Sequence, residues 1–100
     1  MSMWRQGDIM IAATEQLPSR AQKQAHLILA RGEVTGHSHR VADKETATLF
    51  SLADQLFLQV IAAEATIIHE EHGPITLPQG IYRIWQQREY TPKQIRRVID

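Results

Sequence analysis

The sequence of 100 residues contains no cysteine. This absence excludes disulfides, thiolate nucleophiles and cysteine-ligated zinc or iron–sulfur clusters, so any metal site must use histidine, aspartate and glutamate. An excess of one charge is also missing, because 11 basic residues balance 11 acidic ones. A globally positive field, of the kind that attracts nucleic acid or anionic lipid, is therefore not available, and we expect no nucleic-acid partner.

Long hydrophobic runs are missing as well. The sequence has no run of about 18 apolar residues, which a membrane-spanning helix would need. The N-terminal segment also lacks the basic and apolar regions of a signal peptide. We therefore expect a cytoplasmic protein without a membrane partner. The content of 43% apolar and 22% charged residues is typical of a globular chain, and the length predicts one β-rich domain over residues 1–100.

Short apolar runs between turn signals predict an all-β fold. Residues 8–15, 25–34, 37–42 and 46–52 have the composition and spacing of strands, and polar segments separate them. About seven or eight short antiparallel strands, with turn signals about every eight to twelve residues, predict a single small barrel or sandwich.

Residues 53–65 allow two interpretations. The segment contains good helix formers with apolar residues three to four apart, but it also alternates loosely, as a strand does. The β-branched residues Val60, Ile61, Thr66, Ile67 and Ile68 favour the strand.

The C-terminal third predicts extended chain. Residues 74–92 indicate a short extended piece, a turn at Pro78-Gln79-Gly80 and then a long strand. The tail over residues 91–100 fits either a short helix with Pro92 at its first position or a strand-like, irregular segment, and we favour the second.

Four of the five histidines gather in two short segments. They are His37 and His39 in VTGHSHR, and His69 and His72 in IHEEHGP. Residues i and i+2 of a strand face the same side, so His37 and His39 should point together. His72 precedes Gly73-Pro74 and should lie beyond the end of a strand, where the chain can turn back toward His69.

We predict that the four imidazoles form one site for a divalent metal. Zinc, iron, manganese or nickel is held by three or four nitrogen or oxygen ligands at about 2.0 to 2.2 Å. Glu33, Glu70 or Glu71 could add an oxygen. The segment HEEH does not match the HExxH helix motif of metalloproteases, because its histidines are closer together. The alternative is structural: histidines at hairpin ends can hydrogen-bond backbone carbonyls in turns.

The segment QREY at residues 87–90 is a second candidate site. Arg88 and Tyr90 would share one face of a strand, where the guanidinium could hold a carboxylate or phosphate and the tyrosine could donate its hydroxyl. The alternative is a cross-strand Arg–Glu pair with the tyrosine packed at a barrel edge.

Four blocks of the sequence resemble a family of small, uncharacterised bacterial and phage-associated proteins. The blocks are RQGD at 5–8, RGEVTGHSHR at 31–40, HEEHGPITLPQGIYRIWQQREYTP at 69–92 and RRVID at 96–100. This resemblance spans most of the chain. It implies that the blocks form a unit, and it brings no activity with it.

A looser resemblance is to cupins, small β-barrels in which an HxH pair, a following glutamate and a later histidine bind a metal. His37 and His39 match the HxH pair, and Pro78-Gln79-Gly80 is similar to the PxG of the second cupin motif. Glu45 falls one position late for the glutamate, and Arg83 stands where the final histidine is expected. The resemblance implies a barrel, and we transfer no cupin activity.

Two functional hypotheses follow from these patterns. The first is a small metal-binding β-barrel that could activate water or oxygen, or bind a small molecule. The second is a non-catalytic accessory or interaction module, in which the histidines are structural and a strand edge pairs with a protein partner or forms a homodimer. No nucleophile with a neighbouring base can be assigned, so catalysis is left open.

Overall fold

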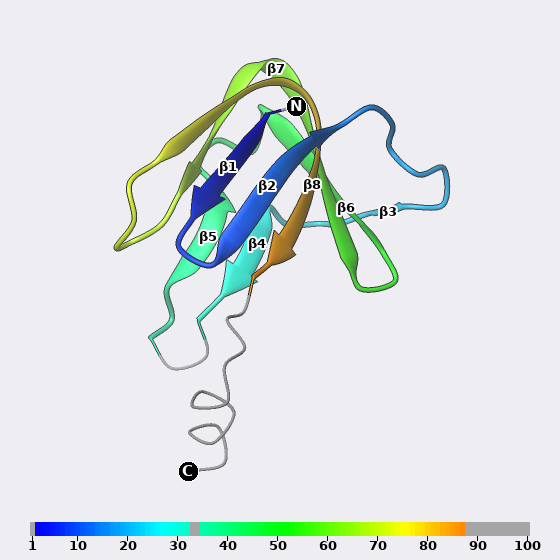
Figure 1. Ribbon diagram of the computed structural model, residues 1–100. Helices are drawn as coiled ribbons and strands as arrows, with labels where there is room; N and C mark the ends of the chain where they lie inside the picture. The colour runs from blue at the N-terminus through cyan, green and yellow to red at the C-terminus, as the bar shows by residue number, and fades with distance from the viewer. Residues whose placement is uncertain (1, 33–34, 88–100) are drawn as a thin grey trace.

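The structure, a computed structural model, describes residues 2–32 and 35–87, and these residues form eight β-strands without a helix (Figure 1). The prediction of an all-β fold with seven or eight antiparallel strands is confirmed. The strands are β1 (Met3–Gln6), β2 (Ile9–Thr14), β3 (Gln22–Lys23), β4 (Ile28–Arg31), β5 (Ser38–Val41), β6 (Ala47–Leu52), β7 (Gln55–Ile68) and β8 (Ile75–Gln86). The sequence patterns did not indicate β1 and β3.

All strands belong to one antiparallel sheet with the order β1-β2-β8-β7-β5-β4. Strand β6 also pairs with β7, and β3 pairs with β6. One edge of β7 is therefore shared, since its first half pairs with β6 and its last residues pair with β5. The sheet curls into a half-barrel, which brings β1 at one end toward β5 near the other (Figure 1).

Strand β7 shows which interpretation of residues 53–65 is correct. Residues Gln55–Ile68 form one continuous strand, so the strand prediction is confirmed. Leu58 and Val60 are buried in its first half, and Ala65 and Ile67 in its second half. These alternate residues face the core, as expected for a strand with one face on it, and the neighbouring Phe57 is buried outside the core cluster.

The turn expected at Pro78-Gln79-Gly80 is wrong. These residues lie inside β8, which runs without interruption from Ile75 to Gln86. Val60 pairs with Gly80 and Glu64 pairs with Pro78, so the three residues 61–63 of β7 lie opposite the single residue Gln79. Proline has no N–H to give to a sheet, and such an irregularity is where a strand tolerates it.

The inner face of the curled sheet forms the hydrophobic core. Its fully buried large side chains are Ile9, Ile11, Leu49, Leu58, Val60, Ile67 and Leu77. Trp4 lies at the edge of this core, with its ring edge-to-face against Tyr82 at a centroid distance of 5.5 Å. Two polar residues, Gln6 and His39, are as deeply buried as the core residues.

Several expectations concern residues outside the described ranges. Glu33, Arg88, Tyr90 and the tail over residues 91–100 are among them. Within the described ranges, no helix has the length and apolar character needed to cross a membrane.

The left-handed backbone conformation in the β6–β7 turn can be tested by mutation. Ala53 has a φ of 56°, a left-handed conformation that costs a residue with a Cβ about 1 to 2 kcal/mol. We expect Ala53→Gly to raise the free energy of unfolding by about 0.5 to 1 kcal/mol, because glycine removes this cost but loses about 0.5 to 1 kcal/mol of chain entropy. Urea denaturation measures the change. The control Ala13→Gly, inside β2, should lower stability by about 0.5 to 1 kcal/mol, and a loss in both variants would contradict the prediction.

Candidate functional site

Three segments that are distant in the sequence meet at one end of the half-barrel. Strand β5 pairs with the end of β7, so the chain at the start of β5 lies beside the chain that leaves β7. The β1–β2 turn adjoins them, because Gln6 at the end of β1 contacts both β5 and β7. His37 and His39 come from the first of these segments, His69 and His72 from the second, and Asp8 from the third.

The structure brings the four paired histidines together. Ring centroids are 4.2 Å apart for His39 and His69, 4.7 Å for His69 and His72, 5.6 Å for His37 and His69, and 5.9 Å for His39 and His72. All four line one pocket of about 170 Å³, together with Asp8, Glu71 and Gln86 among others. The fifth histidine, His26, lines a different pocket.

Gln6 determines which nitrogen of His39 carries a proton. The Gln6 side chain is buried, and its Nε2 donates to the carbonyl oxygens of Ile67 at 3.0 Å and Gly73 at 2.8 Å. Both amide protons are thus in use, so Oε1, which lies 2.8 Å from His39 Nδ1, must accept. His39 therefore has its proton on Nδ1, and in the neutral ring Nε2 presents a lone pair.

The neutral form of His39 is favoured at pH 7. Burial lowers the pKa of His39 below its ordinary value of 6.5, and the nearby His69 and His72 lower it further. The carboxylate of Asp8 acts in the opposite direction without reversing the shift. His39 is only 6% exposed, so its ring is held among neighbours and not in water.

Asp8 faces the free nitrogen of His39. Its Oδ1 lies 3.5 Å from His39 Nε2, and its Oδ2 accepts a hydrogen bond from Gln86 Nε2 at 2.6 Å. Burial alone would raise the pKa of Asp8, but the Gln86 hydrogen bond and the proximity of His39 bring it below the ordinary value of 3.8. Asp8 is therefore ionised at neutral pH, and two acceptor atoms face each other.

Glu70 and Glu71 have different roles. Glu70 Oε1 accepts the N–H of Ser38 at 3.0 Å, and its Oε2 accepts from the guanidinium of Arg40, also at 3.0 Å. The Ser38 hydrogen bond is the largest cause of the lowered pKa of Glu70, and Arg40 adds to it. Glu71 is exposed, and its Oε1 lies 3.4 Å from His37 Nδ1 at the rim of the pocket.

His37, His69 and Glu70 also have potential ligand atoms within 4.8 Å of one another. Some of its ligand atoms already have hydrogen-bond partners within the protein. Both oxygens of Glu70 already accept hydrogen bonds, and His69 Nδ1 accepts the N–H of Glu71 at 3.0 Å. A neutral His69 thus carries its proton on Nε2. The hydrogen bond from Glu71 must open before Nδ1 of His69 can bind a cation.

The close packing of the β1–β2 turn against His72 requires glycine. Gly7 has a φ of +60°, and a Cβ built on it would lie 2.6 Å from His72 Nε2. The backbone of Gly7 therefore forms one wall against the His72 ring.

Sequence reasoning grouped the histidines correctly but missed Gln6, Asp8 and Gln86. Asp8 and Gln6 belong to the block RQGD, in which no site residue was predicted. The available signal was the glycine after Gln6, which indicates a tight turn that carries Asp8. Nothing local connects that turn to His39, because the pair Gln6 and His39 is 33 positions apart.

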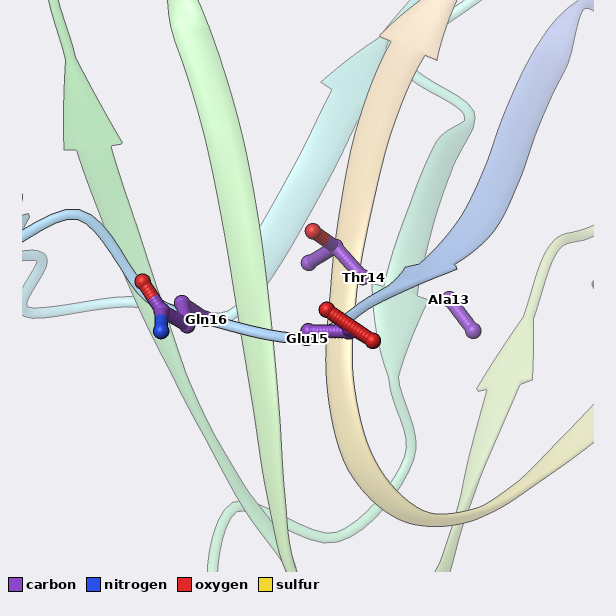
Figure 2. Close-up of a pocket in the computed structure, with 4 residues that line it drawn as sticks. All are labelled: Ala13, Thr14, Glu15 and Gln16. Carbon is purple, nitrogen blue, oxygen red and sulfur yellow. The ribbon is translucent and has the colours of Figure 1, made fainter.

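A larger hollow in the described part of the molecule lies elsewhere. It has a volume of about 700 Å³ and is lined by Ala13, Thr14, Glu15 and Gln16, shown in Figure 2. These residues end β2 and begin the segment after it, at the opposite end of β2 from Asp8. One carboxylate without imidazole neighbours offers poor ligands for a transition metal, so this hollow is not the candidate site.

A family model described as a domain of unknown function (DUF8820) matches residues 5–87. No curated protein and no solved structure matches the chain. The resemblance to a family of uncharacterised proteins is thus confirmed, whereas the comparisons do not support the likeness to cupins. The chain belongs to the DUF8820 family.

Replacing Gln6 tests the buried network. Gln6→Met should lower the free energy of unfolding by about 2 to 3 kcal/mol, because His39 Nδ1–H and the carbonyl oxygen of Ile67 lose their partner in a buried place, and the carbonyl oxygen of Gly73 loses a part-buried one. Chemical denaturation measures the loss. The matched control is Gln79→Met, which removes one exposed hydrogen bond to Ile61 O and should cost about 0.5 kcal/mol or less. Equal losses in the two variants would contradict a special role for Gln6.

The lowered pKa of His39 predicts a pH dependence of the metal-free protein. Its folded pKa is below the unfolded value of 6.5, so the unfolded state binds more protons between the two values. The contribution of neutral His39 to the free energy of unfolding is therefore complete above about pH 6.5 and is lost as the pH falls below that value. Urea unfolding in chelator between about pH 8 and pH 5 should show this decline. His39→Gln should flatten it and the control His26→Gln should not, and an unchanged slope in His39→Gln would refute the assignment.

Proposed function

We propose that this member of the DUF8820 family binds a divalent metal ion through His37, His39, His69 and His72. The observation that carries the proposal is the 2.8 Å contact between His39 Nδ1 and Gln6 Oε1, which leaves Nε2 of a pocket-lining histidine as the nitrogen free to bind an ion. A ligating histidine commonly donates its other ring N–H to such an outer partner, which fixes both its tautomer and its orientation.

The surroundings of His39 support an ion at this place. Neutral imidazole is the form that binds zinc, iron, manganese or nickel, and burial keeps His39 in that form. The four imidazoles lie side by side, with ring centroids 4.2 to 5.9 Å apart, and His37 and His69 have ligand atoms within 4.8 Å of each other. The pocket is open to solvent, so a bound ion could keep a water molecule or a small ligand.

A structural role for the histidines is the second candidate function. The observation that favours it is that some of the polar groups already have partners within the protein, namely His69 Nδ1 with the Glu71 N–H and Glu70 with Ser38 and Arg40. In that case the histidines form a hydrogen-bonded polar cluster that closes one end of the core. The domain would then act as an interaction module that contacts another protein.

Elemental analysis of untagged protein distinguishes the two functions. We expect near-stoichiometric divalent metal in the native protein and its loss in the double variant His37→Ala, His39→Ala, because two of the nitrogen ligands are removed. His72→Ala, at an exposed position, should lower the metal content without disturbing the buried network. His26→Ala is the matched control, since it removes a histidine outside the pocket, and it should retain the full metal content.

Thermal denaturation adds a second measurement. A bound metal at about 100 times its dissociation constant stabilises the folded state by about 2.7 kcal/mol, so a chelator should lower the melting temperature of the native protein. It should have little effect on the double variant. Absence of metal from the native protein, even after dialysis against zinc, iron, manganese and nickel salts in turn, would reject the metal site and leave the structural role.

A further inference from the structure

We infer that Asp8 completes the metal site as a carboxylate ligand, with Oδ1 bound to the same ion as Nε2 of His39. The inference rests on the proposed metal binding and adds a residue from outside the histidine segments. It changes the site from an all-histidine set to a mixed nitrogen and oxygen set.

The distance between Asp8 and His39 fits two ligands of one ion. Their facing atoms, Oδ1 and Nε2, are 3.5 Å apart, which is longer than the usual N–H···O hydrogen bond of about 2.7 to 3.2 Å. Two ligands that each lie about 2.0 to 2.1 Å from zinc and subtend a tetrahedral angle are about 3.3 to 3.4 Å apart. The observed spacing is therefore close to that expected for two ligands of one ion.

Each of the two ligand atoms is left free by a glutamine that holds the opposite side of its group. Gln6 Oε1 accepts the Nδ1–H of His39 at 2.8 Å, and Gln86 Nε2 donates to Oδ2 of Asp8 at 2.6 Å. The remaining atoms, Nε2 and Oδ1, are the ones that face each other. Outer hydrogen bonds of this kind orient the ligands in metal sites.

The other carboxylates beside the histidines do not have this arrangement. Both oxygens of Glu70 accept hydrogen bonds from Ser38 and Arg40. The side chain of Glu71 is 68% exposed and approaches only His37, at the rim of the pocket. Among these three acids, Asp8 is the one whose oxygen approaches the buried imidazole.

A mixed set of neutral imidazoles and one carboxylate determines the class of ion. Such ligands suit borderline divalent ions, namely zinc, iron(II), manganese(II) and cobalt(II), and they do not suit copper(I), which prefers sulfur. The carboxylate also reduces the charge of the ion and its ligands by one. Cobalt(II) is thus a suitable probe, because its visible absorption reports on the ligands that surround it.

The test is a cobalt(II) chloride titration of the full chain and its Asp8→Asn variant, followed by competition with zinc. We expect Asp8→Asn to bind cobalt at least about tenfold more weakly and with an altered visible spectrum. The matched control is Asp54→Asn, which removes the same charge from the exposed β6–β7 turn and should leave affinity and spectrum unchanged. The melting temperature of each metal-free variant shows whether it folds.

A measurement on the native chain does not depend on the variant. The side-chain carboxyl carbon of Asp8, assigned by carbon NMR, should shift when one equivalent of zinc is added, whereas that of Asp54 should not. Unchanged affinity in Asp8→Asn together with an unshifted Asp8 resonance would overturn the inference and leave histidine-only binding in place. An equal loss of affinity in Asp54→Asn would also overturn it, since charge alone would explain the effect. A native chain that binds neither cobalt nor zinc would refute the proposed function itself.

Discussion

The arrangement of the whole site depends on the side-chain amide of Gln6. This amide joins the end of β1 to the carbonyl oxygen of Ile67 in β7, to that of Gly73 in the β7–β8 connection, and to His39 in β5. Strands β1 and β5 are not neighbours in the sheet, so this side chain links two regions that no backbone ladder connects. Glutamine suits the position because it supplies two donor hydrogens and one acceptor, which a glutamate or an aliphatic residue cannot.

The same alternation that builds the core places the site at its end. Val41 and His39 are two residues apart in β5, and both are buried on the inner face of the sheet. A buried imidazole needs partners for its polar atoms, and Gln6 satisfies one of them. The other atom faces the pocket and Asp8. The hydrophobic core thus ends in a polar group with a fixed orientation, a rigid support of the kind that a binding site needs.

Strand β7 makes this arrangement possible by changing its partner. Its first half pairs with β6, and after the irregularity between Val60 and Glu64 its end pairs with β5. The change of partner brings the start of β5 next to the residues that follow Ile68. The irregularity also accommodates Pro78 inside β8, which explains why a Pro-Gln-Gly segment does not form a turn in this fold.

Local patterns predicted a substantial part of the fold and of the site. The alternation and the β-branched residues of 55–68 identified a strand, and the two-residue repeat placed His37 and His39 together, because both signals arise within one segment. The position of His72 beyond a strand end followed from Gly73-Pro74. The turn at Pro78 was predicted wrongly, because the residues that make proline acceptable there lie opposite it, in β7.

Residues whose roles depend on another strand could not be found in this way. Gln6 and Asp8 show no unusual local spacing, and their partners lie in β5, β7 and β8. The sequence by itself determined the all-β class, the absence of cysteine chemistry and the two histidine pairs, since composition and short-range periodicity carry that information. Only the tertiary structure decided that the pairs meet, that Gln6 sets the tautomer of His39 and that Asp8 faces it, because these contacts follow from the pairing and curling of distant strands.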